Sequence, residues 1–533
     1  MMNKILIFSV LLSLHFLSQC SSQALAKKRP NILFAIMDDA TYKHMGAYGC
    51  KWVKTPNFDR VAKNGLLFQR AYTNNAKCAP SRANILTGRN SWQLEEAANH
   101  WPYFPVKFRS FAEALVEHGY RVGYTGKGFS PAVVQNADGS KRDLLVKAYN
   151  SKKTTPPTTK ISPVDYAENF TEFLKEDTDL SKPFFFWFGG LEPHRGYEFG
   201  SGIAKGNKKL SDLQQEDVFK FWPDNDSVRT DLLDYAFEIE YFDHQLGKML
   251  AKLEAIGELE NTLIVVTSDN GMAFPRVKGQ EYEYSNHLPL AIMWADGIQN
   301  PGRKLDNYIS FIDFAPTFLE LAGVEPDASK MQSVTGQSFV SLFQNEPIKN
   351  GNDYVLIGKE RHDVGRPHDQ GYPIRGIVQN NMLYLHNFKP ERWPAGNPET
   401  GYTNTDGGPT KTVVLNKIKT PQEAYFWEWS FGKRPNEEFY DLSTDPDCLH
   451  NLIGDKKYLS HYKLLKEKLF SKLLEQKDPR VLGNGDIFDQ YKFADPQSIN
   501  FYERFFNKDK SLDWGWITDS DFQDISKFPY IQK

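Results

Sequence analysis

"NILFAIMDD", residues 31–39, is the stretch that decides the fold class. From Ile32 to Met37 every residue is apolar, and Asp38 and Asp39 follow directly. A short, uninterrupted apolar run that ends in a polar turn is typical of a strand buried on both faces, as in a parallel sheet. The sequence therefore predicts a central strand that ends in two carboxylates.

Three further runs have the same form, and each ends in side chains that bind ions. They are residues 121–125 before Gly126-Lys127, residues 184–188 before Glu192-Pro193-His194-Arg195, and residues 263–267 before Ser268-Asp269-Asn270-Gly271. Helical patterns lie between them, and the clearest begins at an N-cap at Thr230 or Asp231 and stops at Gly257. This alternation predicts an α/β fold around a mostly parallel sheet, in which ligands bind at the carboxyl ends of the strands.

After residue 375 the alternation of buried strands and helices gives way to a different pattern. Residues 375–378 and 382–386 flank Gln379-Asn380-Asn381 and predict a β-hairpin. A Gly/Pro/Thr-rich loop (394–410), a helix near 455–476 and an aromatic tail with Trp514 and Trp516 follow. We expect a catalytic domain over residues 27–375 and a smaller antiparallel domain with a helix over residues 376–533.

The N-terminus predicts export. Lys4 precedes an apolar run too short to span a bilayer, and Ala24-Leu25-Ala26 fits a cleavage site, so residues 1–26 are interpreted as a signal peptide. "LSQC", ending at Cys20, resembles a lipoprotein box, although Gln19 stands where a small residue is usual. We expect a periplasmic, cell-surface or secreted protein of a bacterium, with membrane contact only through such a lipid anchor.

Composition narrows the function further. The 533 residues carry a net charge of −3, which gives no general basis for binding nucleic acid. Aromatic residues make up 14%, which fits a well-filled core and is also common in proteins that bind carbohydrate. Of the four cysteines, Cys20 belongs to the leader or to a lipid anchor, and the three that remain, an odd number in an exported protein, exclude a disulfide framework. One of the remaining three is expected to have a chemical role.

Two strand ends carry only hard oxygen ligands, namely Asp38, Asp39, Asp269 and Asn270. Such ligands favour Ca²⁺ or Mg²⁺ over a transition metal. Four cationic side chains fall in the same group of turns and loops: Arg82, Lys127, His194 and Lys278. Several cations beside a divalent metal predict a pocket for a compact oxyanion such as sulfate or phosphate.

Cys78 is the cysteine whose surroundings stand out. In "NNAKCAPSRANILTGRN", residues 74–90, Pro80 suits the first turn of a helix that runs to about Thr87, with Gly88 past its end. Cys78 would then lie at a helix N-terminus, where backbone N–H groups favour an anion and lower the pKa of a thiol. The stretch predicts a reactive cysteine at an anion site.

These residues also carry a family resemblance. Cys78-Ala79-Pro80-Ser81-Arg82 resembles the C-x-P-S-R signature of type I sulfatases. The similarity covers nearly the whole mature chain in the family's order, through "RPNILFAIMDD", "TPNFDRVAKNGLLFQRAY", "CAPSRANILTGR", "TGK", "EPHRG", "TSDNGMAFPRVK", "DFAPTFLELAG" and "EFYDLSTDPDCLHNL". It implies an alkaline-phosphatase-like sulfatase fold with a large, mostly parallel sheet flanked by helices and a smaller C-terminal antiparallel sheet.

The resemblance implies roles for the predicted site residues. A maturation enzyme oxidises the cysteine of this family to Cα-formylglycine (3-oxoalanine), so the modified Cys78 would be both nucleophile and metal ligand. Calcium, with Mg²⁺ as the alternative, would be held with Asp38, Asp39, Asp269 and Asn270. Arg82 would hold the formylglycine, Lys127 and Lys278 the sulfate, and His194 would bind sulfate or protonate the leaving oxygen. Many sulfatases have a histidine two residues after the lysine of "GK", where this chain has Phe129.

Two segments resemble bacterial sulfatases of marine algal degraders: "NSWQLEEAANHWPYFP" and "GKERHDVGRPHDQGYPIRG". The resemblance implies a sulfated polysaccharide substrate, with ulvan the leading candidate and carrageenan, fucoidan and heparan sulfate open. It makes His287, Arg361, His362 and His368 candidate substrate contacts. A phosphate or phosphonate monoester hydrolase of the same superfamily is one alternative. An inactive surface protein that binds sulfated glycan is another, although such a protein has no need of an intact formylglycine motif.

Overall fold

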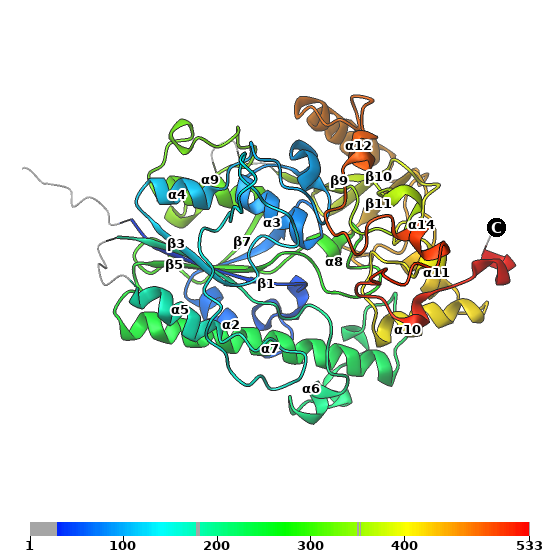
Figure 1. Ribbon diagram of the computed structural model, residues 1–533, viewed down its shortest axis with the longest axis horizontal. Coiled ribbons are helices and arrows are strands. Elements are labelled where there is room, and N and C mark those ends of the chain that lie inside the picture. Colours follow the sequence, from blue (N-terminus) through cyan, green and yellow to red (C-terminus); the bar gives the residue numbers. More distant parts are fainter. Residues whose placement is uncertain (1–28, 177–181, 349–350, 352, 532–533) are drawn as a thin grey trace, which may run out of the picture.

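A seven-stranded sheet forms the centre of the computed structural model, which describes residues 29–176, 182–348, 351 and 353–531 (Figure 1). The strand order is β3-β4-β1-β5-β6-β2-β7. Only β6 runs antiparallel to its neighbours, β5 and β2. The strands are β1 (Asn31–Met37), β2 (Leu66–Tyr72), β3 (Arg121–Gly126), β4 (Phe184–Gly189), β5 (Thr262–Ser268), β6 (Leu290–Met293) and β7 (Arg303–Ser310).

The first predicted strand is β1, and it is buried on both faces as its composition indicates. Leu33 and Met37 join the hydrophobic core on one side of the sheet, whereas Phe34 and Ile36 join the core on the other. All four side chains are almost fully buried, and each contributes about 1.5–3 kcal/mol on transfer from water. The other three predicted runs form β3, β4 and β5, so all four carboxyl ends lie at the same edge.

Helices cover both faces of this sheet (Figure 1). One face carries α2 (Pro56–Lys63), α5 (Tyr166–Lys175) and α7 (Asp226–Ala255), and the other carries α3 (Cys78–Thr87), α4 (Phe111–Glu117) and α9 (Phe314–Leu321). The short helices α6 (Ser201–Ala204) and α8 (Glu283–Asn286) lie in loops of the same part of the chain.

Helix α7 begins one turn earlier than the sequence predicted. Its N-cap is Asn225, whose side chain accepts a hydrogen bond from the Val228 N–H. The predicted caps, Thr230 and Asp231, are buried inside the helix, where Asp231 forms an ion pair with Arg195. The predicted stop is confirmed, because the helix ends at Ala255 and Gly257 adopts the left-handed backbone that follows many helices.

A second, four-stranded antiparallel sheet packs beside the first, in the order β11-β10-β9-β8. The predicted hairpin is β9 (Ile374–Gln379) and β10 (Met382–Asn387), joined by Asn380 and Asn381 with positive φ angles. Strand β8 (Tyr354–Lys359) precedes the boundary that we expected after residue 375, which falls inside β9. The remaining elements are β11 (Glu437–Asp441), α10 (Pro409–Asn416), α11 (Tyr425–Phe431), α12 (Leu459–Glu475), α13 (Ile487–Gln490) and α14 (Phe501–Phe506).

Two further observations bear on the sequence predictions. Cys50, Cys78 and Cys448 form no disulfide with one another, in keeping with their odd number. Within the described ranges, the structure contains no helix long and apolar enough to cross a membrane. The predicted signal peptide, including Cys20, lies outside the described residues.

Candidate active site

The carboxyl ends of β1 and β5 bring three carboxylates together. The Asp39 N–H donates to Asp269 Oδ1 at 3.2 Å, and the Asp269 N–H donates to the Met37 carbonyl at 3.1 Å. Asp39 has a left-handed backbone (φ 76°), which aspartate tolerates better than most residues. Ligand atoms of Asp38, Asp39, Cys78 and Asp269, all buried, consequently lie within 4.8 Å of one another.

Cys78 is the first residue of α3, which ends at Thr87 with Gly88 in the left-handed region, as the sequence predicted. The Cys78 Sγ lies 3.2 Å from Asp38 Oδ1. Burial raises the pKa of the thiol well above its ordinary value, and the Asp38 carboxylate raises it further. The prediction that the helix N-terminus lowers this pKa is therefore wrong, because desolvation and a neighbouring negative charge outweigh the helix dipole.

The cluster fits a hard cation. Burial and the Asp38 carboxylate raise the pKa of Asp269 to about 7, as expected where buried negative charges crowd together. Asn270 donates from Nδ2 to Asp39 Oδ1 at 2.5 Å, whereas its Oδ1 is buried without a hydrogen-bond partner among the described residues. A buried amide oxygen beside three carboxylates is the ligand set that Ca²⁺ and Mg²⁺ prefer.

Two predicted cations lie on the β3–β4 side of this cluster. Lys127 Nζ contacts Asp38 Oδ2 at 2.5 Å, and Arg82 Nε contacts Asp269 Oδ2 at 2.8 Å. Arg82 also donates from Nη1 to the Lys127 carbonyl at 2.7 Å. Gly126, immediately before Lys127, has φ 74°, and a Cβ there would lie 1.9 Å from the Gly189 carbonyl oxygen. Only glycine allows this turn to bring Lys127 so close to the end of β4.

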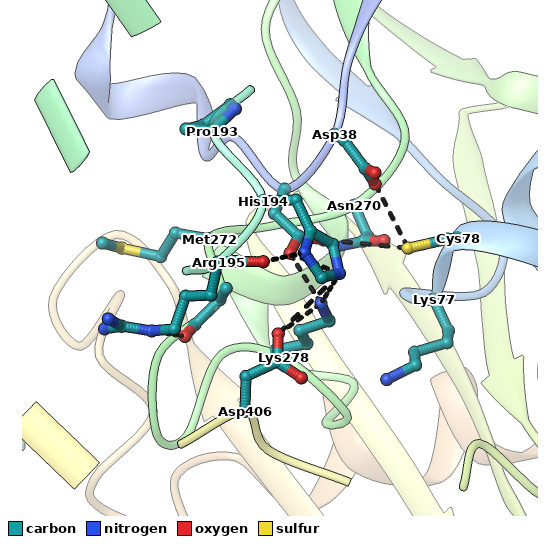
Figure 2. A network of polar contacts seen from close by, with 12 residues as sticks. Asp38, Lys77, Cys78, Pro193, His194, Arg195, Asn270, Met272, Lys278 and Asp406 are labelled. Atoms are coloured by element: carbon teal, nitrogen blue, oxygen red, sulfur yellow. Dashed lines mark hydrogen bonds and ion pairs between the residues drawn. The ribbon is translucent and has the colours of Figure 1, made fainter. Parts of the chain in front are cut away.

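Lys278, His194 and Asp406 form a second group of polar contacts at this site (Figure 2). Lys278 Nζ lies 2.6 Å from both Asp39 Oδ2 and Asp406 Oδ2, and 3.1 Å from His194 Nε2. Burial alone would lower the pKa of Lys278, but the two carboxylates hold it well above its usual value. Burial and then the charge of Lys278 lower the pKa of His194. The ammonium group is thus the charged member of the pair, and it donates to a neutral imidazole.

These groups open into one cavity of about 1070 Å³, whose lining includes Asp38, Cys78, Lys127, His194, Lys278 and Asp406. The size exceeds what a sulfate ion alone needs and suits a ligand of several rings. A second polar cluster lies on its wall. Asp363 joins Lys77 (Nζ to Oδ2, 2.6 Å) to His100 (Nδ1 to Oδ1, 2.9 Å). Burial lowers the pKa of His100 to about 4, so its imidazole is neutral at physiological pH.

Sequence reasoning missed Asp406, Asp363, His100 and Lys77. Asp406 lies in an irregular loop, and Asp363 lies four residues after the end of β8, at Lys359. Signals did exist for the other three. Lys77 directly precedes Cys78, and His100 and Asp363 lie in "NSWQLEEAANHWPYFP" and "GKERHDVGRPHDQGYPIRG", the two segments assigned to the substrate.

The structure does not support His287 and His368 as substrate contacts. His287 is buried between the rings of Tyr42 and Tyr72, at centroid distances of 3.7 and 4.6 Å, and its Nδ1 lies 2.6 Å from Glu283. His368 is exposed and pairs with Glu503 at 3.3 Å. Neither lines the cavity.

Arg361 and His362 are also misassigned, for another reason. Both are buried behind the cavity wall: Arg361 donates to the Tyr491 carbonyl at 2.8 Å, and His362 Nε2 lies 2.7 Å from Asn75 Oδ1. The next two residues, Asp363 and Val364, line the cavity instead. The segment is therefore at the site, but the sequence could not show which of its side chains face inward.

The site combines a buried anionic cluster with flanking cations at the carboxyl edge of a mostly parallel sheet, an arrangement suited to a charged oxyanion. The family model described as sulfatase matches residues 30–324, more than half of the chain, and the chain belongs to this family.

Two curated relatives cover most of the chain. N-sulphoglucosamine sulphohydrolase of Homo sapiens is 26% identical over 505 residues (87% of this chain, 94% of the relative). An ulvan-active sulfatase of Formosa agariphila is 26% identical over 521 residues (96% and 91%). A solved structure of an enzyme with its substrate D-glucosamine-2-N,6-O-disulfate has a TM-score of 0.58 at 20% identity (85% and 99%), which confirms the fold.

Proposed function

We propose that this sulfatase removes sulfate from a sulfated polysaccharide or its oligosaccharides, with a formylglycine made from Cys78 as the nucleophile and calcium as the metal. The observation that carries the proposal is the convergence of Cys78, three buried carboxylates and the cations Lys127, Lys278 and Arg82 at one strand edge. A buried anionic cluster ringed by cations suits a reaction in which a charged sulfuryl group is transferred.

Asp38, Asp39, Asp269 and Asn270 would hold the calcium ion, with Mg²⁺ as the alternative. Bound there, the ion supplies positive charge that favours the ionised nucleophile and a negatively charged sulfate ester. The chain itself keeps the ligands in place, because the Asp39 and Ala40 N–H groups are hydrogen-bonded to Asp269 and Ser268.

The raised thiol pKa supports a modified nucleophile. A maturation enzyme would supply the two-electron oxidant for the Cβ–S unit of Cys78; water then replaces the sulfur, which leaves as hydrogen sulfide, and the resulting aldehyde adds a second water to form a gem-diol. One hydroxyl, ionised after its proton has gone to solvent, attacks the sulfate sulfur while the bond from that sulfur to the sugar oxygen breaks. The second hydroxyl then loses its proton, its oxygen forms C=O, and the bond to sulfate breaks. Sulfate departs with the electron pair, and the aldehyde is ready for the next cycle.

Lys127 and Lys278 are suited to hold the sulfate oxygens, because each ammonium group lies in the cavity beside a predicted metal ligand. Lys278 donates to His194 Nε2 and holds the ring in place, and His194, when protonated, would donate to the departing sugar oxygen. Asp406 keeps Lys278 charged and in place.

The proton lost in the last step needs an acceptor. Phe129, at the family's histidine position, packs edge-on against Phe104 at 5.0 Å and offers none. Apart from His194, His100 is the one histidine among the described residues that line the cavity. Its Nδ1 bonds to Asp363, so in the neutral ring Nε2 carries the lone pair. We assign His100 as the proton acceptor.

Ulvan is the leading substrate candidate, supported by relatives named as ulvan-active sulfatases. The N-sulphoglucosamine relative supports a second candidate, the N-sulfated glucosamine of heparan sulfate. The choice is tested by incubating the enzyme with defined oligosaccharides of ulvan, heparan sulfate, carrageenan and fucoidan and measuring the inorganic sulfate released from each. Failure to release sulfate from any of them would refute a polysaccharide substrate.

The rival activities are tested in parallel. A phosphate or phosphonate monoester hydrolase would prefer 4-nitrophenyl phosphate or 4-nitrophenyl phenylphosphonate to 4-nitrophenyl sulfate under the same conditions. A protein that only binds sulfated glycan would release no sulfate from any ester. Our proposal predicts preference for the sulfate ester.

A further inference from the structure

Two tryptophans at the rim of the active-site cavity have no role in the proposed chemistry. Trp514 and Trp516 belong to the C-terminal segment, far along the chain from Cys78, yet both line the same cavity. Trp516 is 61% exposed and Trp514 is 39% exposed. Exposing two large indole rings at the mouth of an active site is unfavourable unless a ligand covers them.

Trp516 is held in a defined position beside the reacting groups. Its ring centroid lies 4.9 Å from that of His194, at an interplanar angle of 66°. Its backbone carbonyl accepts a hydrogen bond from the Gly407 N–H at 2.5 Å, next to Asp406, the partner of Lys278. The exposed ring is thus fixed by its backbone relative to the centre where the sugar oxygen departs.

Trp514 is anchored from behind. Its ring packs edge-on against Phe522 at 4.6 Å and against Phe505 at 6.0 Å. The Gly515 N–H donates to Asp513 Oδ1 at 2.9 Å, which fixes the turn between the two tryptophans. The rim is therefore ordered on its protein side and open on its cavity side.

Polar side chains line the cavity together with these rings. They are Asp495, Gln497, Ser498 and Asp513, and the Asp513 N–H, next to Trp514, donates to the Gln497 carbonyl at 3.2 Å. Flat aromatic rings flanked by carboxylate, amide and hydroxyl groups match a sugar ring, which has an apolar C–H face and a belt of hydroxyl groups at its edge. The sulfated sugar itself must reach Lys127 and Lys278. The aromatic rings at the rim would therefore contact the next sugar of the oligosaccharide.

We propose that Trp514 and Trp516 form a subsite that stacks on the sugar residue next to the sulfated one, so that the enzyme favours oligosaccharides over small sulfate esters. This inference rests on the proposed function. It differs from the earlier assignment of substrate contacts, because none of these rim residues was among those candidates.

The test compares two substrate sizes in the full-length, metal-loaded, matured enzyme. We expect Trp516→Ala to lower the ratio of kcat/KM on ulvan or heparan sulfate tetrasaccharide to kcat/KM on 4-nitrophenyl sulfate by about tenfold, mainly through KM. Trp514→Ala should lower the same ratio, and Trp516→Tyr, which keeps an aromatic face, should restore most of it. Phe199→Ala is the matched control, because Phe199 is 60% exposed and does not line the cavity, and it should leave the ratio unchanged.

A second readout does not depend on turnover. In Cys78→Ala protein, either tetrasaccharide should change the intrinsic tryptophan fluorescence, and adding Trp516→Ala should raise its Kd by about tenfold. An unchanged ratio and Kd in the Trp516→Ala proteins would overturn the subsite, as would turnover of 4-nitrophenyl sulfate with no turnover of either tetrasaccharide. A change in sedimentation mass with an unchanged ratio would show a contact between two copies instead. If the wild-type enzyme hydrolysed none of these sulfate esters, the proposed function itself would be refuted.

Discussion

Lys278 offers the sharpest test of the site, because its charge has two separable consequences. Its ammonium group bridges Asp39 and Asp406 at 2.6 Å each, and its side chain is 1% exposed. Lys278→Met removes the charge and keeps most of the volume. The variant loses a donor to the sulfate and leaves two carboxylates without their shared partner.

The structure sets the size of both effects. Loss of one donor to a developing oxyanion lowers kcat by about 10²–10³, or about 2.7–4 kcal/mol. Removing one partner of a buried ion pair destabilises a protein by about 3–5 kcal/mol. A bound cation offsets part of the stability loss, because it neutralises Asp39. We therefore expect the fall in the free energy of unfolding to be larger after chelation than with calcium present.

The assay follows kcat on 4-nitrophenyl sulfate and denaturant unfolding with and without a chelator. Lys208→Met is the matched control. The Lys208 side chain is 4% exposed and forms an ion pair with Glu240 at 2.5 Å, but it does not line the cavity. It should lose stability, but its kcat should stay near that of the wild type. If Lys278→Met stays within a few-fold of the wild-type kcat, Lys278 does not contact the sulfate and the reasoning fails.

Three other variants test the remaining parts of the site. Asp269→Ala should abolish activity and lower the calcium content, because it removes a carboxylate from the metal ligands; full metal occupancy with normal turnover would contradict the assignment. Asp406→Asn should lower kcat by about tenfold or more and lower the pKa of Lys278, read as a new basic limb in the pH–rate profile; an unchanged profile would show that Asp39 alone keeps Lys278 charged. His100→Ala should slow sulfate release by about 10²-fold and leave the enzyme covalently sulfated, visible as added mass on the peptide that contains residue 78. Adding Phe129→His should restore part of that rate, whereas a slow His100→Ala enzyme with no covalent sulfate would rule out the acceptor role.

Much of the catalytic centre could be predicted because it follows buried parallel strands. The apolar runs before Asp38 and Asp269 are typical of strands buried on both faces. The run before Lys127 forms the half-buried edge strand β3, which continues the same parallel order. Their carboxyl ends then fall at one edge, whatever the loops do. The helix after Cys78 was predictable for a similar reason, because Pro80 and Gly88 mark its two ends.

The rest depends on packing that a single sequence does not reveal. Asp406 reaches Lys278 from an irregular loop, so no periodicity points to it. His287 looked like a ligand but fills a slot between two tyrosine rings. The thiol pKa of Cys78 was predicted in the wrong direction because the sequence shows the helix terminus but not the burial or the distance to Asp38. The start of α7 was missed because Asn225 is as good a cap as Thr230, and only tertiary contacts decide between them.

The most direct test of the account is the chemical state of residue 78 in active enzyme. Burial and Asp38 make the Cys78 thiol hard to ionise, and a thiolate that attacked sulfur would leave a thiosulfate with no internal route of release. Mass spectrometry of the peptide that spans Cys78 should show an aldehyde oxygen in place of sulfur. Across preparations made with and without the maturation enzyme, kcat should rise in proportion to the converted fraction. Multiple turnovers by protein in which Cys78 is fully unconverted would contradict the mechanism.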